Sequence, residues 1–127
     1  MQAKTVLTES PRQSAPGRRG EVWLVRFGVG QPGEPGKNRP AAIISVDALV
    51  AGVPEDLFVV VPISASREPS GLRPIVTTAE GVDRPSVAVC RAVRSVSATR
   101  MLERLGTLSA ATLRAVEDAL AQILGLP

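Results

Sequence analysis

Short apolar runs separated by turn residues fill the first three quarters of this chain, and their spacing restricts the fold more than any other feature. Five such runs occur, at residues 18–28, 39–46, 57–64, 72–78 and 86–93. Each has the length of a strand, and segments that contain glycine or proline separate most of them. The pattern predicts a mainly β fold, a small and strongly bent sheet or barrel.

The first and third runs carry the clearest strand signals. In the first run the side chains alternate between two faces, one formed by Val22, Leu24 and Arg26 and the other by Trp23, Val25 and Phe27. Residues 57–64, LFVVVPIS, are continuously apolar, which predicts a strand covered on both faces. Because Pro62 has no backbone N–H, we expect a sheet edge or a bulge near the end of that strand.

Helical spacing replaces the strand pattern after Ser97. Residues 97–106, SATRMLERLG, predict a short helix that begins at Ser97 and ends at Gly106. Residues 108–125 predict a longer C-terminal helix with Ser109 as its N-cap and Gly125 at its end. We expect its apolar face to pack in the core or in a dimer interface; this face contains Leu113, Val116, Leu120, Ile123 and Leu124.

Two segments fit neither pattern. Residues 1–17 are polar and contain two prolines, which predicts a flexible N-terminal tail ahead of a single domain at residues 18–127. Residues 28–38 form a loop with four glycines and two prolines. A connection of this length without its own secondary structure is usually functional or disordered.

The composition excludes several classes of function. The chain has no histidine, so zinc sites of the His/Cys kind and Ser-His-Asp triads are impossible. Its three aromatic residues, one Trp and two Phe, are too few for a nucleic-acid surface built from exposed rings. Thirteen arginines against two lysines and a net charge of +3 favour an anionic partner, although a GC-rich genome also produces such a ratio.

The single cysteine and the hydropathy pattern indicate the compartment. Cys90 has no partner for an internal disulfide, and its apolar neighbours predict a buried, unreactive thiol. No apolar stretch approaches the ~20 residues that a membrane span requires. The N-terminus also lacks the apolar segment of a secretion signal. We therefore expect a cytoplasmic protein.

The order of several motifs resembles the MazF/PemK family of toxins. The motifs are RRGEVWLVRF, the glycine-rich loop, GKNRPAAIISVD, VVVPIS and SVAVCRAVRSVS, followed by the C-terminal helix. Together they cover residues 18 to about 126. The most specific pieces are Glu34 with Arg39-Pro40, then Pro62-Ile63-Ser64 at the end of the central strand, and Val93-Arg94-Ser95 closing the last long strand.

This resemblance implies an SH3-like β-barrel with added helices that works as a homodimer in a type II toxin–antitoxin pair. It also implies a sequence-selective endoribonuclease that cuts single-stranded RNA without a metal ion or other cofactor. Arg39 and Ser64 are then the catalytic pair, and Glu34 is a further catalytic candidate. The cognate antitoxin, similar to MazE, is expected to lay an acidic segment across the RNA groove.

The chemistry of metal-free RNA cleavage suits these residue types. The 2′-hydroxyl attacks the neighbouring phosphorus and leaves a 2′,3′-cyclic phosphate and a 5′-hydroxyl, so the protein needs no nucleophile of its own. It needs a proton acceptor, charge neutralisation at the phosphorane and a proton donor for the leaving oxygen. Arg39 can neutralise the charge, Glu34 is the conventional base, and Ser64 can donate to a non-bridging oxygen.

Each candidate also has an ordinary structural explanation. Arg39, Glu34 and Ser64 can be solvated residues at strand or loop ends, and Arg94 can pair with a carboxylate beneath the sheet instead of binding RNA. Further RNA contacts are expected from residues near the groove, namely Lys37, Asn38, Ser66, Arg67 and Arg73.

Two departures from the family pattern concern base selection. Gly33 stands where some relatives carry serine, and Arg91-Ala92 stand where relatives often have Glu-Gln. The methyl group of Ala92 cannot read a base as a glutamine can. Two other functions stay open: a gyrase poison of the CcdB type, disfavoured because no aromatic residue follows Phe58, and a non-catalytic nucleic-acid-binding barrel.

Overall fold

The computed structural model describes residues 17–28, 37–47 and 57–127. In these residues, seven strands precede one helix. The strands are β1 (Glu21–Arg26), β2 (Asn38–Ile43), β3 (Leu57–Ser64), β4 (Ile75–Val76), β5 (Ser86–Ala88), β6 (Arg94–Ser97) and β7 (Met101–Thr107). The helix is α1 (Ala110–Leu124), and short 3-10 turns occur at η2 (Thr78–Glu80), η3 (Cys90–Ala92) and η4 (Ala98–Arg100).

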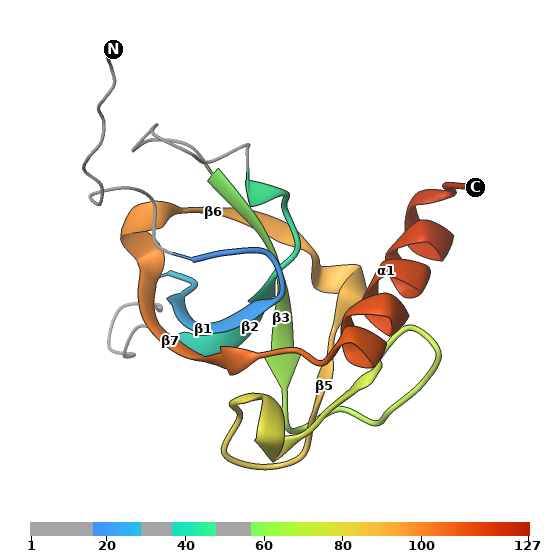
Figure 1. Cartoon of the computed structure of the whole chain (residues 1–127), viewed down its shortest axis with the longest axis horizontal. Coiled ribbons are helices and arrows are strands. Elements are labelled where there is room, and N and C mark those ends of the chain that lie inside the picture. The colour runs from blue at the N-terminus through green and yellow to red at the C-terminus, as the bar shows by residue number, and fades with distance from the viewer. Residues whose placement is uncertain (1–16, 29–36, 48–56) are drawn as a thin grey trace.

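The strands form one antiparallel sheet that curls into a barrel (Figure 1). β1 pairs with β2, and β2 pairs with β3. The other edge of β3 pairs with β6 near its start and with β5 at its end. After η4 the chain continues into β7, which pairs with the free edge of β1. Residues 94–107 therefore close the sheet.

The two faces of the sheet cover two separate groups of buried side chains. The inner core fills the barrel and contains Val25, Ala41, Ile43, Phe58, Val60, Val96 and Met101. The outer core lies between the sheet and α1 and contains Val22, Ala42, Val61, Ile63, Cys90, Val116 and Leu120 among others. The predicted alternation in β1 is confirmed, because Val25 belongs to the inner core and Val22 to the outer core.

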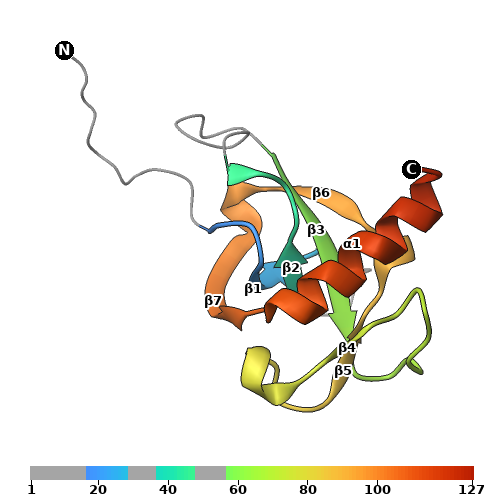
Figure 2. The ribbon, with the colours of Figure 1, turned by 45° about the vertical axis from the view of Figure 1, so that its right-hand side comes forward.

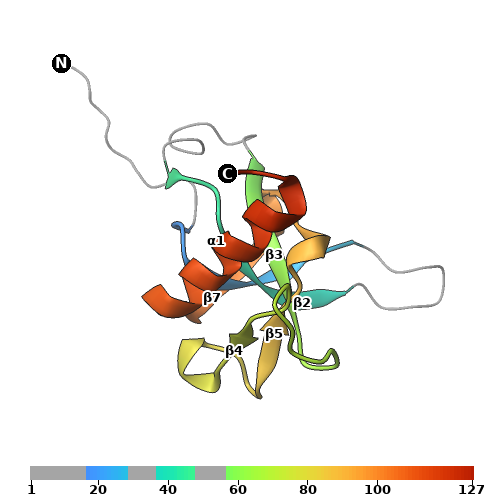
Figure 3. The same ribbon diagram turned by 90° about the vertical axis from the view of Figure 1, so that its right-hand side faces the viewer.

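Helix α1 lies across the outside of the barrel and covers the outer core (Figures 2 and 3). Its predicted ends are confirmed. The Ser109 hydroxyl accepts a hydrogen bond from the Thr112 N–H at 3.1 Å, and Gly125 adopts a left-handed conformation with φ 69°. Val116 and Leu120 are buried as expected, whereas Leu124 is exposed and does not belong to the packed face.

The short helix predicted at residues 97–106 is wrong. Only Ala98–Arg100 form a single 3-10 turn, and Met101–Thr107 form strand β7. The spacing of Met101 and Leu105 suits a helix, but β1 offers an open edge whose backbone groups need partners. Gly106 also suits the strand, because a Cβ there would clash with the Glu80 backbone carbonyl.

Two further sequence predictions need correction. Residues 86–93 do not form one strand, because η3 separates β5 from β6, and Arg94 therefore begins a strand instead of closing one. Pro62 does not lie at a sheet edge, since β3 has partners on both sides. It lies where the partner changes from β6 to β5, so its missing N–H removes no ladder bond. The tail predicted at residues 1–17 lies outside the described residues except for Gly17.

A buried carboxylate joins the outer core to the start of α1. Glu80 accepts hydrogen bonds from the backbone N–H groups of Thr77 and Ser109, each at 2.8 Å. Burial by itself raises the pKa of Glu80, but these bonds and those from the Thr112 and Thr77 side chains outweigh it and hold the pKa below 4.5. The carboxylate also lies at the positive end of the helix dipole.

We expect Glu80→Ala to lower the free energy of unfolding by about 2–3 kcal/mol at pH 7, because it leaves buried N–H groups without an acceptor. Since the pKa of Glu80 is lowered in the folded state, its contribution is present above pH 4.5 and is lost as pH falls through the folded-state pKa. Urea unfolding between pH 7 and pH 3 measures both effects. Exposed Glu103→Ala is the control, and equal stability of the two variants would contradict the assignment.

Candidate functional site

The register between β2 and β3 points to two predicted catalytic residues, which lie two positions beyond its last pair. The paired ladder runs from Ile43↔Val60 to Ala41↔Pro62. Continued by two residues, the same register would set Arg39 opposite Ser64. Residues directly opposite each other in an antiparallel pair have Cβ atoms about 5 Å apart and project from the same face.

That shared face is the one that encloses the inner core. Arg39 lies two residues before Ala41 on β2, and Ala41 is fully buried in the inner core. Ser64 lies four residues after Val60 on β3 and so projects from the same face as this inner-core residue. Arg39 is exposed and Ser64 is half-buried, so both lie where the inner core meets solvent.

Phe27 and Arg94 extend this group. The Arg94 guanidinium carbon lies 5.2 Å from the centre of the Phe27 ring, a cation–π contact. Phe27 follows β1 and donates its N–H to the Lys37 carbonyl at 2.9 Å, which continues the β1–β2 register and puts Phe27 diagonal to Arg39. We call Phe27, Arg39, Ser64 and Arg94 the basic rim.

The Ser64 hydroxyl is held in place by the turn that follows β3. The Ser66 N–H donates to the Ser64 Oγ at 3.2 Å, and the two hydroxyl oxygens are 3.1 Å apart. The backbone bond uses a lone pair of Ser64 and leaves its O–H able to donate. The turn thus restricts a serine rotamer that no β-methyl group restricts.

The arginines divide into paired and unpaired groups. In the described residues, five arginines have a carboxylate partner, namely Arg18, Arg19, Arg84, Arg104 and Arg114. No described carboxylate lies within 4.0 Å of the guanidinium groups of Arg39, Arg67 or Arg94. The alternative in which Arg94 pairs with a carboxylate therefore finds no support in this part of the chain. An anion approaching the rim meets positive charge that no described acidic group neutralises.

The remaining predicted site residues lie in or near β2 and β3, with one exception outside the described residues. Lys37 precedes β2 and Asn38 begins it, but Asn38 alternates with Arg39 and so projects from the other face of the strand. Ser66 and Arg67 are exposed in the segment after β3. Glu34 lies outside the described residues, so its predicted role stays a prediction.

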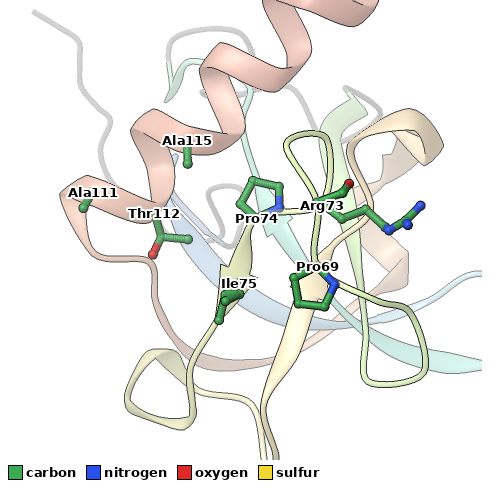
Figure 4. Close-up of a pocket in the computed structure, with 8 residues that line it drawn as sticks. Pro69, Arg73, Pro74, Ile75, Ala111, Thr112 and Ala115 are labelled. Atoms are coloured by element: carbon green, nitrogen blue, oxygen red, sulfur yellow. The ribbon is translucent and has the colours of Figure 1, made fainter.

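Arg73 has a structural contact and lies beside a largely apolar cavity. Its Nε donates to the Glu68 carbonyl at 2.6 Å and so closes the loop between β3 and β4. The cavity, about 450 Å³, lies between this loop and the first turns of α1 and is lined mainly by apolar groups (Figure 4). Ala111 and Thr112 lie on the other side of that cavity, and the Arg73 guanidinium points away from them.

Sequence reasoning assigned Phe27 only to a strand face and did not recognise it as a partner of Arg94. The available signal was its place in the alternating β1 pattern, which puts it beside the inner core with Trp23. The contact itself joins residues 67 positions apart, and strand spacing alone does not reveal such a pair.

A family model now decides the class of this protein. The model for the PemK-like, MazF-like toxins of type II toxin–antitoxin systems matches residues 18–124. This chain belongs to that family. The resemblance inferred from its motifs is confirmed.

Individual relatives agree with this assignment. Endoribonuclease MazF9 of Mycobacterium tuberculosis is 30% identical over 110 residues, which cover 81% of this chain and 92% of that protein. A MazE–MazF crystal structure (Form-II) from Deinococcus radiodurans has a TM-score of 0.75 at 24% identity, covering 89% of this chain and 98% of that chain. An endoribonuclease with its cognate antitoxin from a Mycobacterial species has a TM-score of 0.71 at 21% identity, covering 88% and 98%. The predicted barrel with a C-terminal helix is thereby confirmed.

The described residues contain neither a metal-binding cluster nor a reactive thiol. Among them, no three cysteine or acidic side chains gather into a group that could hold a metal ion. No helix in that part of the MazF-like chain is long and apolar enough to cross a membrane. Cys90 is fully buried, and burial raises the pKa of its thiol to about 11, so the thiolate is scarce near neutral pH.

We expect Cys90 in the native protein to react with a disulfide reagent such as DTNB at pH 8 only as fast as the fold opens, because both burial and the raised pKa suppress attack. Absorbance at the thionitrobenzoate band follows the reaction. The same protein in urea provides the control and should react at once. Rapid stoichiometric labelling without denaturant would contradict the buried, protonated thiol.

Proposed function

We propose that this chain, a MazF-like toxin of the endoribonuclease class, cuts single-stranded RNA at the basic rim in the cytoplasm and needs no metal ion. The 2′-hydroxyl of the RNA attacks the adjacent phosphorus, which yields a 2′,3′-cyclic phosphate and a 5′-hydroxyl. The observation that carries the proposal is the β2–β3 register, which supports Arg39 and Ser64 as neighbours on one face.

The proposed roles follow from the chemistry of each side chain. Arg39 donates two N–H groups to the phosphorane oxygens as negative charge develops there. Ser64 donates its O–H to a non-bridging oxygen, and the Ser66 N–H keeps that hydroxyl oriented. Glu34 takes the 2′ proton, since a guanidinium stays protonated and is a poor base, and water protonates the 5′ oxygen as it leaves. Arg94, held on Phe27, binds a neighbouring phosphate.

The proposed protein partner is a cognate acidic antitoxin, and the proposed active form is a homodimer. Relatives of this fold have been solved as MazE–MazF complexes and with a cognate antitoxin, which supports the first partner. A segment rich in Asp and Glu would find at the rim arginines without a described carboxylate partner. It would thereby block the same phosphate-binding groups that RNA needs.

We expect Arg39→Gln to abolish RNA cleavage while the fold stays intact, because the variant loses the charge that stabilises the phosphorane. A long RNA incubated with the purified protein in EDTA, with end-group analysis of the fragments, measures cleavage; circular dichroism checks the fold. Arg114→Gln is the matched control, since it removes one charge from an exposed pair on α1.

Discrete fragments with 5′-hydroxyl ends from the parent protein support the proposal. Parental cleavage by the Arg39 variant would overturn the site. Intact RNA that is nevertheless bound by the parent would favour the non-catalytic nucleic-acid-binding barrel instead.

We expect Ser64→Ala to reduce the cleavage rate about 10²–10³-fold, the usual effect of removing one hydrogen-bond donor to a developing charge. Ser64→Thr keeps the hydroxyl and should retain activity, because the Ser66 N–H can still donate to the hydroxyl oxygen at this position. Single-turnover cleavage of one RNA by the parent protein and by the two variants gives the comparison. Equal loss in both variants would indicate packing damage instead of a lost donor.

A further inference from the structure

A small polar cavity opens at the corner where β6 turns into β7. It has a volume of about 330 Å³ and is lined by Arg26, Ser97, Thr99 and Arg100. Two arginines and two residues with hydroxyl groups therefore line it, and no lining residue is acidic. Nothing in the chemistry proposed for the rim uses these four residues.

The cavity is organised before any ligand arrives. Arg100 donates one Nη1 hydrogen bond to the Arg26 carbonyl at 3.1 Å, which ties the η4 turn to the end of β1. The hydroxyl oxygens of Ser97 and Thr99 lie 2.9 Å apart. Arg100 is half-buried and thus has less conformational freedom to lose on binding than a free surface arginine.

The charge of the cavity is not neutralised by its described surroundings. No carboxylate of the described residues lies within 4.0 Å of the Arg26 or Arg100 guanidinium groups. In contrast, Arg104, four residues after Arg100, pairs with Glu21 at 3.0 Å. Two guanidinium forks with adjacent hydroxyl donors are a set that matches the several acceptor oxygens of a phosphate.

The position of the cavity relates it to the basic rim. Arg26 immediately precedes Phe27 and is paired with Asn38, the residue before Arg39. The Cα atoms of Arg26 and Arg39 are therefore separated by about one strand spacing, ~5 Å, plus one step along the chain. The Arg26 side chain alternates with Phe27 and projects from the opposite face of the sheet, so an RNA strand reaches it from the rim around the end of β1. Ser97 lies three residues after Arg94 on β6, about 10 Å along that strand.

We propose that this cavity is a second phosphate subsite, which binds a backbone phosphodiester of an RNA strand that runs from the rim around the end of β1. The inference rests on the proposed function and adds a non-catalytic contact to it. It concerns affinity for strands long enough to reach beyond the rim. Phosphate is favoured over a protein carboxylate because arginines and hydroxyl residues from two strands and a turn line the same cavity. An RNA backbone offers ester and ribose oxygens beside the two non-bridging oxygens, whereas a carboxylate offers two oxygens alone.

The test measures binding of 2′-O-methyl RNA, which cannot be cleaved by 2′-hydroxyl attack, as a function of salt. We expect Arg100→Gln to reduce the slope of log Kobs against log[salt] by about 0.7, the value for one phosphate contact with a single strand. The ratio of parent affinity to variant affinity is then about fivefold larger at 0.1 M salt than at 1 M salt. A trinucleotide confined to the rim should bind both proteins equally.

Matched variants separate binding from folding. Arg114→Gln removes the same charge from α1 and should leave the slope unchanged. The double variant Ser97→Ala with Thr99→Val keeps both arginines and removes only the hydroxyl donors, so it should weaken binding of the long strand without changing the slope. Thermal unfolding of each variant shows whether η4 still holds to β1, and binding is compared only among variants with the parental midpoint.

Each outcome bears on the subsite independently of the cleavage proposal. An unchanged slope for Arg100→Gln, or the same loss with the trinucleotide, overturns the subsite even if the parent protein cuts RNA. A reduced slope supports it even if the parent binds RNA without cutting. If Arg100→Gln leaves RNA binding unchanged but weakens binding of poly-glutamate, the cavity serves an acidic protein segment and the RNA assignment is wrong.

Discussion

The barrel depends on one segment, residues 94–107, that satisfies two open strand edges. β6 pairs with β3 and β7 pairs with β1, with η4 forming the corner between them. This closure fixes β1, β2 and β3 around the inner core and thereby brings the Arg94 guanidinium over the Phe27 ring. Catalysis by charge stabilisation needs donors that are held in place before the reaction, so the closed sheet is also the scaffold of the proposed chemistry.

The arginines of this chain have two kinds of task. Arg19 and Arg104 hold elements together, since they pair with Glu117 on α1 and with Glu21 on β1. The arginines of the basic rim and of the η4 cavity have no such partner among the described carboxylates. A guanidinium that is not engaged by a carboxylate keeps its fork available for phosphate, which explains how a modest net charge of +3 can still present a strongly positive site.

Local signals were reliable where a residue acts on its own neighbours. The Ser109 cap, the Gly125 end, the alternation of β1 and the bounds of β3 follow from short-range geometry and were predicted correctly. The segment 97–106 was misjudged because its apolar spacing suits either a helix or a strand. Only the open edge of β1 decides between them.

The sequence by itself determined the strand-rich fold class, the terminal helix, the exclusion of histidine chemistry and, through its motifs, the toxin family. Tertiary structure alone decided which strands pair, including the β2–β3 register from which the Arg39–Ser64 pair is extrapolated, and that Phe27 contacts Arg94. The physical reason is that hydrogen-bonded ladders and cation–π contacts join residues far apart in the chain. Their partners are set by which edges and faces must be covered, and no local pattern encodes that choice.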